Sequence, residues 1–527
     1  MIDLNNTKTY VILQILLAVF VLLCFRSGID NFFAGDDFDW LFDTIKMLRN
    51  PWFFIEAQNY DLRPTENLYF LANLVLAKGH PLSFHLSAIL IHVLNVGLVS
   101  LLIAHLCKNR LAGLIGALFW GLNYKHVEAV FRPHATADSL ALLGGVGAFL
   151  FFVNKRPGWA SVALLFGLFA KENALVFPLL FTLYVVWFVS ENKKQWAIRT
   201  IPSWIVALIV AGLVKFVRSG DPAYLTIDLN AFSRFWELML TYVGPDVVFT
   251  KQVWLHGQAY VFSWWLAGIL CILLGLALWK FPVIYRFGVL WMIIATIPTL
   301  FIVYQTSRYY YVPLVGLGII IGQGGNTLLN YFQQRHARRA IMALSGGFLL
   351  LMMYFVAGVH LEERDYDMYG EVHREVIESF TEEIFPSMPK DEQSMAVLLY
   401  PETRKWEEVL YAQYLLKPWF FPKTYKWVYA RPFGMLGGLA TPYGLMSYGS
   451  YCQGESSLFV GVSYEMFRQH VLAGDFYVIV HDYDTNTLNF GNETLKAEVA
   501  KRVDDRYFYH FFQPGHFDPT YTGEAYL

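Results

Sequence analysis

Long apolar runs alternate with short polar connections over the chain up to residue 358. A helix needs about 20 mostly apolar residues to cross a bilayer. By that measure we expect a first span over Tyr10–Phe25, followed by ten further runs near residues 84–106, 111–123, 138–153, 159–170, 174–190, 200–217, 261–279, 284–303, 309–325 and 340–358. The pattern predicts an all-α polytopic membrane bundle of about 11 transmembrane helices over residues 1–358.

Two of these runs, 111–123 and 159–170, are short for a crossing, and the distribution of basic residues supports counting both. Loops on the cytoplasmic side of membrane proteins are enriched in Lys and Arg. If every run crosses, alternate loops carry twelve basic residues against the single acid Glu191. The opposite loops are mixed or acidic, and residues 27–82 hold eight acids and four bases. We therefore expect a cytoplasmic N-terminus, with residues 27–82 as an external loop.

Composition agrees with a membrane protein. Of the 527 residues, 56% are hydrophobic and only 16% are charged, whereas about 25% are charged in average globular chains. The net charge of −2 gives no basic footprint for nucleic acid. The four cysteines are scattered, which implies no disulfide framework. We expect the plasma (inner) membrane as the location, or the ER membrane in a eukaryote.

Residues 359–527 are predicted to form a separate extracytoplasmic domain of mixed α/β structure. Strands are expected at 395–400, 457–463 and 476–481, and an amphipathic helix at 402–416. The run from Asp482 to Glu493 resembles part of a calcium loop but has Thr487 where glycine is required. A hairpin turn is the favoured interpretation there.

Adjacent carboxylates follow the first span at Asp36 and Asp37. At the mouth of a bundle they could act as a general base for a hydroxyl nucleophile or form half of a metal site. The alternative is a solvated helix N-cap, a position that Asp favours. Arg63, in the same loop, could hold a phosphate through its guanidinium group or form a structural salt bridge.

Several polar side chains crowd the expected external loop between the runs 111–123 and 138–153. His126, Glu128, His134 and Asp138 are ligand types suited to Mn²⁺ or Zn²⁺. Their spacing matches no specific zinc pattern, so hydrogen bonding to a polar substrate or between helices is favoured. A weaker option is a divalent cation held by Asp37, Glu128 and Asp138.

A further group combines Lys171-Glu172 in a tight hairpin with Arg308-Tyr309 before the run 309–325. Lysine and arginine around a cavity at membrane depth suit an anionic lipid phosphate. The alternative is interfacial snorkelling beside an aromatic belt. His85, His92 and Asn95 lie within a span at helical spacing, and hydrogen bonds between helices are the favoured role for them.

Four ordered segments carry a resemblance to a known family. RPTENLYFLANLVLAKGHPLSFHLSAILIHVLNV begins with Arg63, and the later segments HVEAVFRPHATADSLA, AKENALVFP and SRYYYVPLVGLG contain, in order, His126, Glu128, Asp138, Lys171, Glu172, Arg308 and Tyr309. Together they resemble GT-C membrane glycosyltransferases, and more closely the protein O-mannosyltransferases that carry tetratricopeptide tails, with their prokaryotic relatives. The chain departs from that pattern at Ser87-Ala88, at Thr136 and in lacking the repeats.

The resemblance implies an inverting transferase that moves a sugar from a polyprenyl (or dolichyl) phosphate donor to an acceptor hydroxyl outside the membrane. It implies Asp36, or else Asp37, as the base. Lys171 and Arg308 would stabilise the departing lipid phosphate, and Arg63 would orient the donor. The acceptor would be a protein or a glycan. No cofactor is required by the closest relatives, although a divalent cation is an option from the wider superfamily.

Two other classes compete with this interpretation. Transporters and flippases often contain inverted repeats with helices broken near the midplane, and this sequence shows no internal repeat. A non-catalytic scaffold is the third class. Asp36, Lys171 and Arg308 argue against it.

Overall fold

The computed structural model describes residues 6–33, 62–217, 278–301 and 306–379, short stretches at 51–54, 395–399, 440–441, 444–445, 472–474, 476–482 and 487–490, and isolated positions between them. The chain separates into two compact units. The first contains Met1–Asp30, Tyr60–Tyr69 and Gly79–Arg364, and the second contains Asn31–Asn59, Phe70–Lys78 and Asp365–Leu527. The expected domain boundary at residue 358 falls inside a long helix, and that division stays a prediction.

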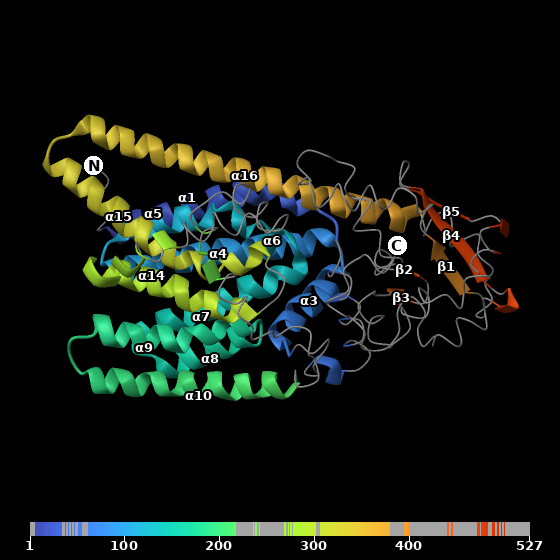
Figure 1. Ribbon diagram of the computed structural model, residues 1–527, viewed down its shortest axis with the longest axis horizontal. Coiled ribbons are helices and arrows are strands. Elements are labelled where there is room, and N and C mark those ends of the chain that lie inside the picture. Colours follow the sequence, from blue (N-terminus) through green and yellow to red (C-terminus); the bar gives the residue numbers. More distant parts are fainter. Residues whose placement is uncertain are drawn as a thin grey trace. The chain divides into compact units, whose positions relative to one another are not determined.

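Helices dominate the first unit (Figure 1). They are α1 (Thr7–Phe25), α4 (Pro81–Cys107), α5 (Arg110–Gly121), α7 (Thr136–Val153), α8 (Pro157–Leu168), α9 (Phe177–Phe188), α10 (Lys193–Val217), α14 (Val283–Thr296) and α15 (Leu314–Gln334). Two further helices, α3 (Pro64–Ala77) and α16 (Arg338–Ser379), begin in the first unit and continue into the second. Short elements of three to five residues are α6 (Val127–Phe131), η3 (Tyr124–His126), η5 (Glu172–Val176) and η8 (Ser307–Tyr310).

Membrane-spanning character follows from the length and apolarity of these helices. Within the described residues, six helical segments are long and apolar enough to cross a bilayer: Thr7–Asp30, Pro81–Cys107, Pro133–Val153, Lys193–Phe216, Val283–Leu300 and Arg338–Arg364. Shorter apolar helices occupy Arg110–Gly121, Pro157–Leu168 and Glu172–Phe188. The protein is therefore a multi-pass membrane protein. The expected span near 261–279 lies largely outside the described residues, so the number of crossings stays a prediction.

Local sequence signals set the ends of several helices. The side chain of Asn6 caps α1 by accepting a hydrogen bond from the Lys8 amide at 2.9 Å. Lys108 ends α4 in the left-handed conformation (φ 50°), and Asn109 then caps α5 through the Ala112 amide at 2.9 Å. This two-residue connection turns the chain back and makes α4 and α5 antiparallel neighbours.

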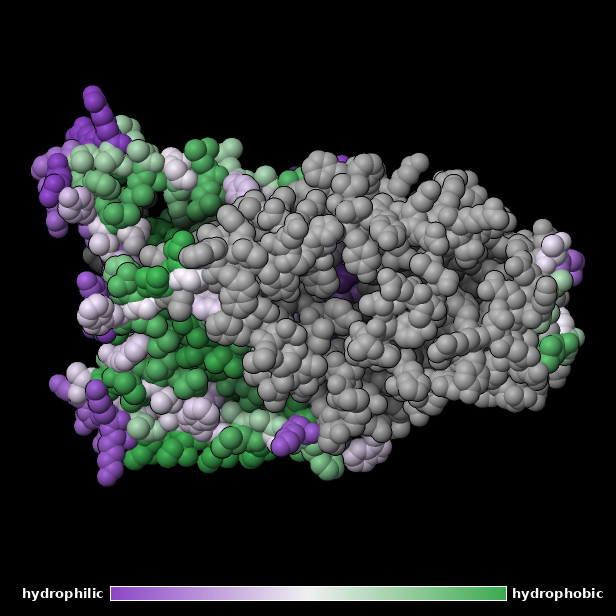
Figure 2. Space-filling view, in the orientation of Figure 1, coloured by the Kyte–Doolittle hydropathy of each residue, from purple (hydrophilic) through white to green (hydrophobic). Residues whose placement is uncertain are grey.

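The connections fall into two groups at opposite ends of the bundle. The side chain of His105, near the end of α4, lies 3.2 Å from the Tyr184 hydroxyl of α9. Arg110 at the start of α5 donates a hydrogen bond to Thr7 at the start of α1. We call this the basic end, because its connections carry Lys108, Lys155, Arg156, Lys193, Lys194, Arg335, Arg338 and Arg339. Figure 2 shows hydrophilic side chains gathered there and a hydrophobic flank beside them.

Close packing of α5 against α15 depends on glycine. A Cβ atom on Gly116 would meet the carbonyl oxygen of Gly318, and one on Gly322 would meet that of Ala112. Small residues of this kind allow membrane helices to approach closely without a hydrophobic driving force. The contact brings the chain just before α15 into the bundle.

Buried aromatic and polar side chains form the core next to this contact. His92 lies 2.8 Å from the Tyr311 hydroxyl through Nδ1 and 2.9 Å from the Gly121 carbonyl oxygen through Nε2. Asn95 donates to the Ser139 carbonyl at 2.8 Å and to the Tyr311 hydroxyl at 3.2 Å. The predicted role of His92 and Asn95 in linking helices is confirmed.

Strands occur in the second unit. β1 (Met395–Leu399) pairs in parallel with β4 (Phe476–Asp482), and β4 pairs antiparallel with β5 (Thr487–Phe490). A second pair is β2 (Ala440–Thr441) with β3 (Gly444–Leu445). The β4–β5 hairpin matches the turn favoured after Asp482. The strand expected at 457–463 and the helix at 402–416 lie outside the described residues, and the α/β class of this part stays a prediction.

Candidate functional site

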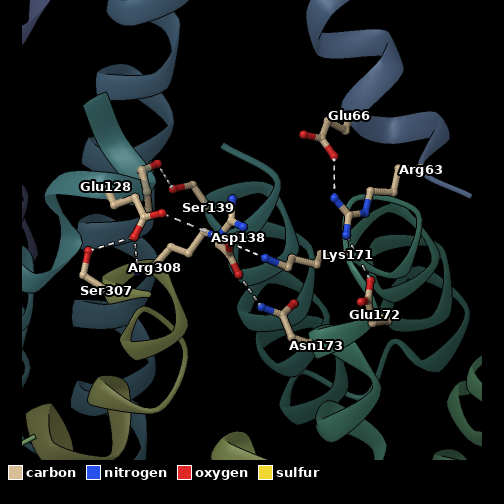
Figure 3. Close-up of polar contacts among 11 residues, drawn as sticks. Arg63, Glu66, Glu128, Asp138, Ser139, Lys171, Glu172, Asn173, Ser307 and Arg308 are labelled. Carbon is tan, nitrogen blue, oxygen red and sulfur yellow. Dashed lines mark hydrogen bonds and ion pairs between the residues drawn. The ribbon is translucent and has the colours of Figure 1, made fainter. Parts of the chain in front are cut away.

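Charged side chains from five parts of the chain meet at the end of the bundle opposite the basic end (Figure 3). We call this the ion-pair end. Its residues come from the chain before and within α3, from α6, from the first turn of α7, from η5 and the residue preceding it, and from η8. They are Arg63, Glu66, Glu128, Asp138, Lys171, Glu172, Asn173, Ser307 and Arg308.

Lys171 and Asp138 form the most buried pair. The Nζ atom of Lys171 lies 2.6 Å from Oδ2 of Asp138, and their side chains are 6% and 0% exposed. Asn173 donates a hydrogen bond to the other carboxylate oxygen, Oδ1, at 2.8 Å. The Tyr309 ring covers Lys171, with its centroid 5.0 Å from Nζ. Asp138 therefore has both oxygens satisfied, and Lys171 faces a carboxylate and an aromatic ring.

Glu128 organises the chain that precedes α15. Its Oε2 atom accepts hydrogen bonds from the Ser307 hydroxyl at 3.0 Å and from the Arg308 backbone amide at 3.1 Å. Its Oε1 atom lies 3.8 Å from Nε of Arg308. Burial raises the pKa of Glu128, but the positive charges of Arg308 and Arg132 and the Arg308 amide outweigh it, so the pKa lies below its usual value. Glu128 is thus an anion that holds η8 in place.

Arg63 links α3 to the hairpin between α8 and α9. Its guanidinium group lies 3.4 Å from Glu66 and 3.6 Å from Glu172. The backbone beside it is fixed, because Thr65 bonds to the carbonyls of Phe169 (3.1 Å) and Phe166 (2.8 Å). With side-chain exposures of 14% for Arg63 and 22% for Glu172, this pair is more open than Lys171–Asp138.

Of the two first-loop carboxylates, Asp37 is among the described residues. Asp36 lies outside the described residues. Asp37 is helical and 1% exposed, in the second unit. Their assignment as base stays a prediction from the resemblance.

His126 lies apart from the ion pairs, although it was expected with Glu128 and Asp138. Its ring is fully buried, with centroids 4.7 Å from Tyr311, 4.8 Å from Trp120 and 5.8 Å from His92. Burial, followed by the neighbouring His92, lowers its pKa well below the ordinary value. His126 is therefore a neutral packing residue in the aromatic core.

Metal ligation was an option for the carboxylates of this region. In the described part of the chain, no group of three His, Cys, Asp or Glu side chains is placed to hold a metal ion. Glu128 and Asp138 instead face Arg308 and Lys171. The donor set described here fits ion pairing better than metal binding.

Three participants were not expected from the sequence. Asn173 bonds Asp138, Ser307 bonds Glu128, and Glu66 bonds Arg63. Each stands within three residues of a residue that was singled out. An amide, hydroxyl or carboxylate adjacent to a charged motif residue is the signal that could have indicated them.

Comparisons with known proteins add a fold-level likeness. No protein-family model and no curated protein matches the chain. Among solved structures, ArnT from Cupriavidus metallidurans bound to undecaprenyl phosphate is similar, with 13% identity, a TM-score of 0.47, and coverage of 91% of this chain and 94% of that one. The apo form of the same protein is similar with 13% identity, a TM-score of 0.45, and coverage of 89% of this chain and 93% of that one. At such values these structures assign no function to this chain.

Proposed function

We propose that the protein is an integral-membrane GT-C glycosyltransferase of the inverting type. It moves a hexose, such as mannose or a related sugar, from a polyprenyl-phosphate donor to an acceptor hydroxyl on a protein or glycan outside the membrane. The carrying observation is that residues from all four resembling segments meet at one end of the bundle: Arg63, Glu128, Asp138, Lys171, Glu172, Arg308 and Tyr309. Chance motif matches scattered over 250 residues would have no reason to converge.

The three cations differ in side-chain exposure, and we assign their roles on that basis. Arg308 and Arg63 have side chains 20% and 14% exposed, whereas Lys171 is 6% exposed and lies against Asp138. We assign the donor phosphate to the two arginines, whose planar guanidinium groups match a phosphate bidentately. Lys171 is a positioning residue in this proposal. The Tyr309 ring contacts both Lys171 and Arg308, so Lys171 helps to position Arg308 through Tyr309.

Charge stabilisation at the leaving group is the main catalytic demand on this site. As the bond from the anomeric carbon to the phosphate oxygen breaks, negative charge grows on the lipid phosphate. Fixed positive groups aimed at developing charge commonly supply a large part of rate enhancement. The acceptor hydroxyl loses its proton to Asp36 or Asp37, attacks from the opposite face and so inverts the configuration.

Transfer in vitro tests the proposal. Purified protein is given synthetic polyprenyl-phosphate sugars and a pool of peptide and glycan acceptors, and product is measured by mass spectrometry. Arg308→Gln, Asp36→Asn and Asp37→Asn are compared with Arg339→Gln, which changes an exposed arginine at the basic end. We expect at least a hundredfold loss for Arg308→Gln and for one Asp variant, and wild-type transfer for Arg339→Gln.

Two outcomes would contradict parts of this scheme. Full activity in both Asp variants would remove the first-loop base. Absence of transfer from every donor, combined with uptake or flipping of the labelled lipid in proteoliposomes, would make the protein a transporter.

A further inference from the structure

A groove runs between α1 and α4 at the basic end, far from the ion pairs. It has a volume of about 890 Å³, within the range of pockets that enclose small ligands. Its walls are mostly apolar side chains of α1 and α4, including Val11, Ile15, Leu94, Leu98 and Leu101. Leu143 of α7 also lines it.

Glycine creates part of this hollow. Gly97 of α4 lines the groove, and a Cβ atom placed on it would meet nothing within 4 Å. Most glycines at the helix contacts described above would instead clash with backbone. Gly97 therefore leaves space that a ligand can fill.

The length of the groove matches one leaflet. On α1 its lining residues run from Thr7 to Ala18, which at 1.5 Å per residue is about 16 Å. The hydrocarbon core of a bilayer is about 30 Å thick. The groove therefore accommodates the acyl chain of a lipid of one leaflet.

Polar residues line the groove where it meets the basic end. Arg110 lines the groove, donates to the Thr7 hydroxyl at 3.2 Å and lies 5.1 Å from the Tyr10 ring. Deeper in the wall, Tyr10 and Gln14 are joined by a 2.7 Å hydrogen bond and contact Ser100.

Charge at this end favours an anion. None of the side chains that line the groove in the described part of the chain is acidic, and the exposed Lys8 and Lys108 adjoin it in sequence. A guanidinium fork at the level of the head groups matches a phosphate diester.

We propose that this groove is a binding site for an anionic phospholipid of the leaflet at the basic end. One acyl chain lies along Gly97 between α1 and α4, and the phosphate lies at Arg110. The site is separate from the donor site and does not depend on the proposed transferase activity.

The test is lipid retention by the full chain. Protein in detergent is mixed with phosphatidylglycerol or phosphatidylcholine of identical acyl chains, and bound lipid is counted by native mass spectrometry. We expect wild type to retain phosphatidylglycerol at least tenfold more than phosphatidylcholine. Gly97→Leu fills the groove and Arg110→Gln removes the charge, and each should lower phosphatidylglycerol retention about tenfold.

Matched variants separate the groove from general lipid contact. Gly212→Leu alters a glycine of α10 that also has nothing within 4 Å, and Arg339→Gln removes an exposed arginine at the same end. Both should retain phosphatidylglycerol like wild type. Circular dichroism and size exclusion establish that every variant is folded.

Three results would overturn the proposal. The first is wild-type retention by folded Gly97→Leu. The second is equal retention of the two phospholipids by wild type. The third is displacement of phosphatidylglycerol from wild type by equimolar polyprenyl phosphate, which would make the groove a site for the polyprenyl chain.

Discussion

The two ends of the bundle use the same residue types in different ways. At the ion-pair end, Lys171, Arg308 and Arg63 each face at least one carboxylate. Three of those carboxylates, Asp138, Glu128 and Glu66, are buried. At the basic end, Lys108, Arg335 and Arg339 are exposed. The charges at one end pair across chain segments, and those at the other end are exposed.

This contrast teaches where a charge is costly to remove. A buried ion that loses its partner keeps its desolvation penalty without compensation. An exposed cation on a helix end regains water when its neighbour is removed. Position therefore decides the effect of a substitution more than the residue type does.

Lys171→Met should have the largest effect on stability. It leaves Asp138 buried without its cation, which costs about 3–5 kcal/mol, although Asn173 still donates to that carboxylate. Thermal unfolding in detergent measures the loss. The double variant Lys171→Met/Asp138→Leu should recover much of it, and a double variant as unstable as Lys171→Met would contradict the pairing.

Glu128→Gln should be less destabilising, by about 1.5–3 kcal/mol from the loss of hydrogen bonds to a charged acceptor. Because the pKa of Glu128 is lowered on folding, its carboxylate stabilises the fold above the unfolded pKa of about 4.3. That contribution is lost as pH falls through the lower, folded pKa. The unfolding midpoints of wild type and Glu128→Gln should differ steadily from pH 8 to 6 and converge below pH 4. A constant difference down to pH 3 would contradict this role.

Arg63→Gln should lower transfer more than stability. Screening limits the pair of Arg63 with the partly exposed Glu172 to about 1 kcal/mol or less, but Arg63 also faces the fully buried Glu66 at 3.4 Å. The unfolding temperature should fall by less than for Glu128→Gln, because the contact to Glu66 is longer than the hydrogen bonds that Glu128 accepts. Transfer should fall at least tenfold with a raised KM for the donor. Arg63→Lys keeps the positive charge but lacks the planar guanidinium group, so its transfer activity should lie between those of wild type and Arg63→Gln. A large loss of stability with unchanged KM would make Arg63 purely structural.

Arg335→Gln should have the smallest effect. Arg335 is exposed at the end of α15 and lies 4.5 Å from the Tyr331 ring. Surface substitutions of this kind usually change stability by no more than about 0.5 kcal/mol. Unfolding and transfer should both match wild type. A shift as large as that of Glu128→Gln would remove the distinction between the two ends.

Much of the membrane part could be predicted, because hydrophobic runs follow directly from the thickness of a bilayer. The spans that contain α1, α4 and α7 could be predicted from the length and apolar composition of their sequence runs alone. The convergence of Asp138 and Lys171 at one end followed from counting crossings. Their direct contact did not follow, since 33 residues separate them and no local spacing encodes the pairing.

The position of His126 could not be predicted from the sequence. It stands two residues from Glu128, and its residue type suggested a shared polar site. The short elements η3 and α6 redirect the chain, however, so that His126 packs on Trp120 and Tyr311 while Glu128 reaches Ser307 and Arg308. Such a turn depends on tertiary packing of α4 and α15, and sequence periodicity over a few residues cannot indicate it.

The glycine contact between α5 and α15 also bears on how the chain is synthesised. Gly322 follows Gly116 by 206 residues in the sequence, and at 5–20 residues per second it leaves the ribosome about 10–40 s later. Throughout that interval the α5 surface waits in the bilayer without its partner. Because glycine adds no polar group to that surface, lipid can cover it until α15 is inserted.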